Sequence, residues 1–105
     1  MLGLEGREGA SLVTRYDRLL GALDRANEGW TLHSETSPSP DLQEAASIVF
    51  DLLYDLDYET GGELVPRLAG VYGYLADELL SIGRTRDRSR LGDIRRVVGV
   101  LRAAV

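Results

Sequence analysis

Few side chains in this sequence are of the types that carry catalysis. His33 is the one histidine among 105 residues, and it lies in a segment rich in serine and proline, where a histidine is usually solvated. There is no cysteine to act as a nucleophile, no lysine to form a Schiff base, and no glycine-rich loop opening a helix to hold phosphate. These residue types argue against an enzyme.

Asp51 and Asp55 form the pair whose spacing best suits a metal ion. Because they are four residues apart, they share one face of a helix, as carboxylate ligands in a helical bundle do. A di-metal bundle also needs Glu-x-x-His pairs on facing helices, and the sequence has none. We therefore expect no metal and no cofactor.

The elements that carry these residues are predicted to be helices. Apolar residues recur at helical spacing over about 11–31, 40–58, 61–83 and 87–104, and no stretch alternates with the period of a strand. Four helices joined by short loops favour an all-α fold, an antiparallel up-down four-helix bundle. The length of the chain fits a single domain over residues 1–105, with the glycine-rich residues 1–10 flexible.

The helix predicted over 61–83 is apolar around about half of its circumference, more than a helix lying on a single neighbour requires, which suggests a central position in the bundle. Pro66 falls in its first turn, where the missing N–H has no partner inside the helix. Leu75 and Leu79 lie in the middle of the main stripe and are expected to be structural, while Gly70 and Gly73 would let another backbone approach closely. A second stripe runs beside the first; the two contain Leu64, Leu68, Val71, Leu75, Leu79 and Ile82, and Val65, Ala69, Tyr72, Ala76 and Leu80.

The helix predicted over 40–58 is apolar around about two-thirds of its circumference, more than an outer helix of a bundle buries. The excess predicts a surface that meets a partner protein, although a well-filled core would give the same pattern. Ile48 and Tyr54 lie at the two edges of the apolar arc. The candidate partner-binding residues are Ile48, Phe50, Leu52 and Tyr54, with Tyr72 and Tyr74 from the 61–83 helix.

Charge is distributed unevenly along the chain. Residues 41–63 contain acids and no base, whereas residues 84–102 are rich in arginine, in a chain of net charge −5. We expect the arginines of the last helix to face the acids of 51–63, as two solvated faces that attract one another. The alternative, a basic patch for nucleic acid, is disfavoured by the net negative charge and by the lack of aromatic residues among the arginines.

No apolar run approaches the roughly 20 residues of a membrane-spanning helix, and the N-terminus does not resemble a signal peptide. We therefore expect a soluble intracellular protein with no membrane insertion.

One block of residues resembles a known family. The run from Leu56 to Leu64, LDYETGGEL, precedes Arg67-Leu68 and then VYGYL over residues 71–75. This block is similar to the signature of the FliS family of flagellar secretion chaperones, which typically reads L-D-x-E-x-G-G-E-[IL], then N-L, then L-Y-D-Y-M. Residues 12–17, LVTRYD, are similar to the family segment L-I-V-M-L-Y-D. The resemblance extends over about 12–104, and its specific part is the block from GGE to Y-x-Y.

The resemblance implies a cytoplasmic four-helix bundle that binds the C-terminal helical region of flagellin, which is disordered before export. Such a chaperone prevents premature polymerisation and assists secretion, with the export apparatus or a co-chaperone as further partners. The free protein is then expected to be a monomer or a weak homodimer. Apolar grooves that receive amphipathic segments would suit this role.

The chain also departs from the family pattern. The usual N-terminal arm is largely missing, Arg15 replaces an apolar residue, and Arg67 stands where the family has asparagine. Gly73 and Ala76 replace an acid and a larger residue. The sequence therefore predicts a divergent member, and the alternative is a self-associating helical adaptor with no flagellar role.

Overall fold

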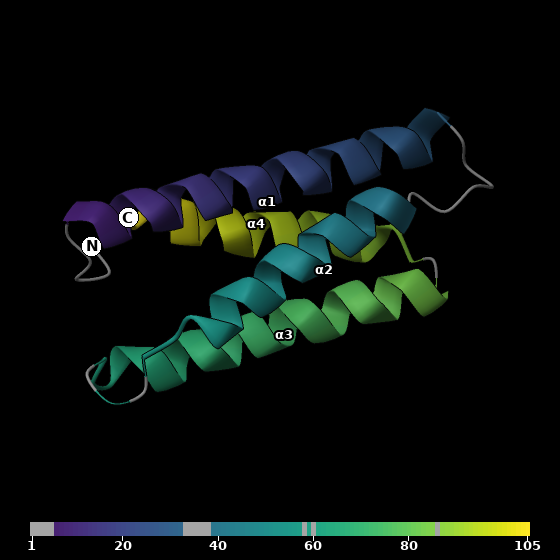
Figure 1. Ribbon diagram of the computed structural model, residues 1–105. Helices are drawn as coiled ribbons and strands as arrows, with labels where there is room; N and C mark the ends of the chain where they lie inside the picture. The colour runs from purple at the N-terminus through teal and green to yellow at the C-terminus, as the bar shows by residue number, and fades with distance from the viewer. Residues whose placement is uncertain (1–5, 33–38, 58, 60, 86) are drawn as a thin grey trace.

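The structure, a computed structural model, describes residues 6–32, 39–57, 59, 61–85 and 87–105, and it is all-helical in these ranges. The four helices are α1 (Gly6–Leu32), α2 (Ser39–Tyr54), α3 (Leu64–Thr85) and α4 (Ser89–Ala103) (Figure 1). The described residues contain no strand. The predicted helical class, with four helices, is confirmed.

The helices pack as a ring of neighbours. α1 lies against α2 and α4, and α3 lies against α2 and, less extensively, against α4. In the described part of the chain, the backbones of α1 and α3, and those of α2 and α4, are not adjacent but lie diagonally across the core. The expectation that the third helix lies at the centre of the bundle is therefore wrong. Like each of the other helices, α3 has two neighbours and borders the shared core.

Ion pairs fix the register between α1 and α2. Arg25, late in α1, pairs with Asp41 and Glu44 at the start of α2, with N–O distances of 3.3 and 2.8 Å. Arg15, early in α1, pairs with Asp55, just beyond the end of α2. The early part of each helix therefore lies beside the late part of the other.

Ion pairs also join α4 to α1. Arg95 reaches Asp24 at 2.6 Å and Arg102 reaches Asp17 at 2.7 Å, so the end of α4 lies beside the early part of α1. The expectation that these arginines face the acids of 51–63 is wrong. α4 adjoins α1 and α3 rather than α2, so the acids within reach are those of its own neighbours.

The core is apolar apart from one pair of hydroxyl groups. Tyr16 of α1 and Tyr72 of α3 are buried, and their hydroxyl oxygens are 2.6 Å apart in a hydrogen bond that crosses the core. Leu75 and Leu79 are buried as predicted. The other fully buried large side chains are Leu19, Leu23, Val49, Ile82, Ile94 and Val98.

Two helix boundaries differ from those predicted. α1 begins at Gly6 rather than near residue 11, so the predicted flexible segment is helical from Gly6 onward. Extending an existing helix adds one hydrogen bond for each residue fixed, which offsets the low propensity of two glycines. α2 ends at Tyr54 rather than near 58. There the Asp57 carboxylate accepts a hydrogen bond from the Glu59 N–H at 3.0 Å, which favours a turn over another helical turn.

The turn between α2 and α3 depends on two glycines. The Gly61 N–H donates to the Asp57 carbonyl at 3.0 Å, and a Cβ on Gly61 would overlap the Val65 side chain. Gly62 has a φ of 59°, in the left-handed region that residues with a Cβ rarely adopt. The two glycines of the GGE part of the sequence block therefore have a structural explanation.

Candidate partner-binding surface

The six predicted binding residues divide into two groups in the structure. Ile48, Leu52 and Tyr72 are buried members of the core cluster. Phe50, Tyr54 and Tyr74 are 39%, 86% and 45% exposed. Ile48 was expected at the edge of the apolar arc, but its exposure of 4% places it inside the bundle, because α1 covers that side of α2. The role of all six in binding remains a prediction.

Phe50 and Tyr54 lie together on α2, since residues four apart are neighbours on a helix. Glu44 and Asp55 mark the side of α2 that faces α1, because both pair with α1 arginines. Phe50 lies about a third of a turn or more away from both. Its helical neighbour Leu53 is half-buried against the core. Phe50 therefore lies at the outer edge of α2, on the side toward α3.

α3 contributes apolar positions that adjoin this edge. Ala69, Gly73 and Leu80 recur at helical spacing and share one face. Glu78 marks the α4 side of α3, because it accepts a hydrogen bond from Arg90 at 3.5 Å. Leu80 follows Glu78 by two residues, so it points to the opposite side, toward α2. Leu80 is 52% exposed, and a Cβ on Gly73 would meet nothing within 4 Å.

Tyr74 does not belong with the two exposed aromatics of α2. It precedes Glu78 by four residues, so both lie on the α4 side of α3. The structure therefore separates Tyr74 from Phe50 and Tyr54, although the sequence placed them together.

We call the exposed and half-exposed apolar positions shared by these two helices the α2–α3 surface. Its α3 residues were not among the predicted binding residues, although Ala69 and Leu80 belong to the second apolar stripe of the 61–83 helix. The open space at Gly70 and Gly73 shows that no other part of the described chain approaches them. The α2–α3 surface comprises Ala46, Phe50, Leu53 and Tyr54 of α2, and Ala69, Gly73 and Leu80 of α3.

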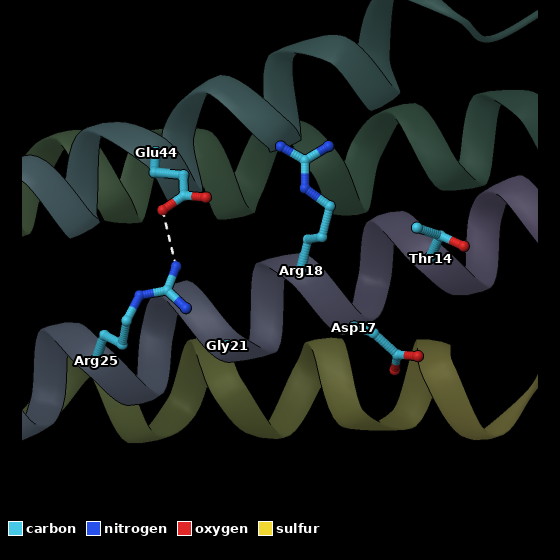
Figure 2. Close-up of a pocket in the computed structure, with 6 residues that line it drawn as sticks. All are labelled: Thr14, Asp17, Arg18, Gly21, Arg25 and Glu44. Carbon is cyan, nitrogen blue, oxygen red and sulfur yellow. Dashed lines mark hydrogen bonds and ion pairs between the residues drawn. The ribbon is translucent and has the colours of Figure 1, made fainter.

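A hollow of about 360 Å³ lies elsewhere, on the outer side of α1 (Figure 2). Three of its four charged side chains, Arg25, Glu44 and Asp17, already have ion-pair partners. Arg25 donates to Glu44 at 2.8 Å, and Asp17 accepts from Arg102 at 2.7 Å. Hydrogen bonds to Glu44 and then Asp41 raise the pKa of Arg25, which favours its charged form. The lining residues are Thr14, Asp17, Arg18, Gly21, Arg25 and Glu44, and this set offers no nucleophile beside a general base.

Other kinds of site find no support in the described residues. No three His, Cys, Asp or Glu side chains among them are placed to hold a metal ion. None of the described helices is long and apolar enough to cross a membrane. His33 lies outside the described residues.

The comparisons with known proteins give one result. A sequence model of the family described as flagellar protein FliS matches residues 8–104, nearly the whole chain. No curated protein and no solved structure matches the chain.

Proposed function

The chain belongs to the FliS family of flagellar proteins, and from this premise we propose that it is a flagellar export chaperone for flagellin. In this proposal, the disordered C-terminal helical region of flagellin docks on the α2–α3 surface in the cytoplasm. Docking keeps the subunit from polymerising prematurely and assists its secretion. The chain acts by binding rather than by catalysis.

The observation that carries the proposal is the exposure of Phe50, Tyr54 and Leu80 along two adjoining helices. Exposed aromatic side chains that lie together commonly mark sites of protein association, since they supply most of the binding free energy. An amphipathic segment laid along α2 and α3 would bury these side chains, as in other helix-in-groove complexes.

The finer architecture is part of the same proposal. An up-down antiparallel bundle within a single domain is supported by the ion pairs that join opposite ends of α1 and α2, and of α1 and α4. In such a bundle α2 and α3 are adjacent, so an extended segment of flagellin could bind along both helices.

Removal of the two aromatic side chains of α2 tests the proposal. We expect Phe50→Ala/Tyr54→Ala to weaken binding of a flagellin C-terminal peptide at least tenfold by calorimetry, because truncating an anchor typically costs more than about 1–2 kcal/mol. Val100→Ala is the control, since Val100 is 66% exposed on α4. It should leave the affinity unchanged, and both variants should keep the melting temperature.

A double alanine variant that binds as tightly as the unsubstituted protein would contradict the placement. The alternative, a self-associating adaptor, uses the same surface for a second copy of the chain. Light scattering separates the two, because the chaperone is a monomer or weak dimer without flagellin, whereas an adaptor forms a stable dimer that Phe50→Ala/Tyr54→Ala dissociates.

A further inference from the structure

Asp51 differs from the other carboxylates of α2 in having no ion-pair partner in the described part of the chain. Asp41 and Glu44 both pair with Arg25, and the following residue on the same face, Asp55, pairs with Arg15. Asp51 is exposed. Arg18 extends from α1 toward α2 (Figure 2), but it forms no ion pair with Asp51.

Asp51 borders the α2–α3 surface. It precedes Tyr54 by three residues, so the two side chains are neighbours on the exposed face of α2. Asp51 lies on the side of Tyr54 nearer to α1, because Asp55, four residues later, pairs with Arg15. A segment that packs on the Tyr54 ring therefore passes beside the Asp51 carboxylate.

Among the described residues, α2 supplies no basic side chain at this edge, and Arg18 of α1, which extends toward α2 (Figure 2), forms no ion pair with Asp51. Residues 41–63 contain no base, and Arg15 is already paired with Asp55. Arg67 precedes Glu78 by three helical turns and so lies on the α4 side of α3. The carboxylate of Asp51, beside Tyr54, thus forms no ion pair within the described residues.

From this arrangement we propose that Asp51 selects flagellin segments that carry an arginine or lysine beside their apolar residues, at the point where they pass Tyr54. The inference rests on the proposed function and adds the charge of the partner to it. A rim carboxylate of this kind acts mainly on the rate of association and on its salt dependence, because it steers the partner before apolar contact is made.

The test compares Asp51→Asn with a matched control, Glu28→Gln. Glu28 is exposed on α1, beyond Asp24 toward the end of the helix that adjoins the start of α2, and its substitution changes the net charge equally. The probes are a synthetic flagellin C-terminal peptide and the same peptide with its basic residues replaced by glutamine. Stopped-flow association and dissociation rates are measured at low salt and near 1 M NaCl.

We expect Asp51→Asn to lower the affinity about two- to fivefold at low salt, chiefly through slower association, as for an exposed ion pair. The difference should vanish near 1 M salt, where charges are screened within about 3 Å. Glu28→Gln should bind as the unsubstituted protein does. The peptide without bases should not distinguish Asp51→Asn from the unsubstituted protein.

Three results would overturn the inference, and they have different consequences for the proposed function. If Asp51→Asn behaves like Glu28→Gln while Phe50→Ala/Tyr54→Ala still abolishes binding, the surface is correct and the charge selection is wrong. If the unsubstituted protein does not bind the peptide, both the function and the selection are wrong. A loss shared by Arg18→Gln and Asp51→Asn at both salt concentrations would assign Asp51 to an internal contact with α1.

Discussion

At the scale of single residues, the hydrogen bond between Tyr16 and Tyr72 is the polar contact on which the core depends. Burial raises the pKa of Tyr16 and of Tyr72 above the usual value near 10, because a phenolate would lose its hydration. The hydrogen bond to Tyr72 raises the pKa of Tyr16 further. Both hydroxyl groups therefore remain protonated in the folded protein.

We expect the free energy of unfolding to fall as the pH rises above about 10. The unfolded chain then loses tyrosine protons that the folded protein retains, so each shifted tyrosine lowers stability by up to ~1.4 kcal/mol per pH unit. Below about pH 10 the contribution is fully present. The chain has no lysine or cysteine side chain to titrate in this range, so urea unfolding at pH 8 to 11 reports mainly on tyrosine. Tyr16→Phe/Tyr72→Phe should flatten the dependence.

The same pair predicts a non-additive result at neutral pH. Tyr16→Phe leaves the buried Tyr72 hydroxyl without its partner, which should cost about 1–3 kcal/mol, whereas replacing both tyrosines should cost less than the sum of the single changes. Urea unfolding of the two single variants and the double variant measures the coupling. Additive losses would mean that the hydrogen bond contributes nothing to stability.

Gly61 gives the third prediction at this scale. Gly61→Ala should destabilise the protein by about 1–3 kcal/mol, because the added Cβ overlaps the Val65 side chain and lies 2.6 Å from the Asp57 carbonyl oxygen. Gly92→Ala is the matched control, since a Cβ there meets nothing within 4 Å and alanine favours a helix by about 1 kcal/mol. Thermal melts that shift in the same direction for both variants would refute this account of the turn.

At the scale of the elements, α4 is joined to α1 by exposed ion pairs and packs less extensively on α3. Each exposed pair contributes only about 0.2–1 kcal/mol, and salt screens it. We therefore expect the amides of 90–102 to exchange hydrogen faster than those of 68–80, and the difference to grow in high salt. Equal protection of the two segments, independent of salt, would show that apolar packing alone holds α4.

The sequence predicted which segments are helical better than it predicted where the helices end and which of their faces are buried. Helical spacing identified all four helices, because apolar periodicity reflects a shared core. The end of α2 depends on the Asp57 carboxylate and on Gly61, contacts that periodicity does not encode. Which helix covers Ile48, and on which side Tyr74 lies, depends on how the helices are arranged around the core. A stripe on one helix cannot specify that arrangement.

At the scale of the whole molecule, the ion pairs and the apolar surface lie on different sides. α1 is joined by ion pairs to α2 and α4, whereas the described residues of α2 and α3 share no ion pair with each other. The side of the bundle around α1 is thus engaged in holding the fold together. The α2–α3 surface exposes Phe50, Tyr54 and Leu80 and has no ion pair between the described residues of its two helices, so we expect the partner to bind there.

The most direct measurement is a titration of the isotope-labelled protein with a flagellin C-terminal peptide, followed by the shifts of its backbone amide resonances. The proposed function predicts that the largest changes fall within 46–54 and 69–80, with little change at Asp24 and Arg95 on the α1–α4 side. Changes concentrated along α1 and α4, with 46–54 unaffected, would contradict the claim that flagellin docks on the α2–α3 surface.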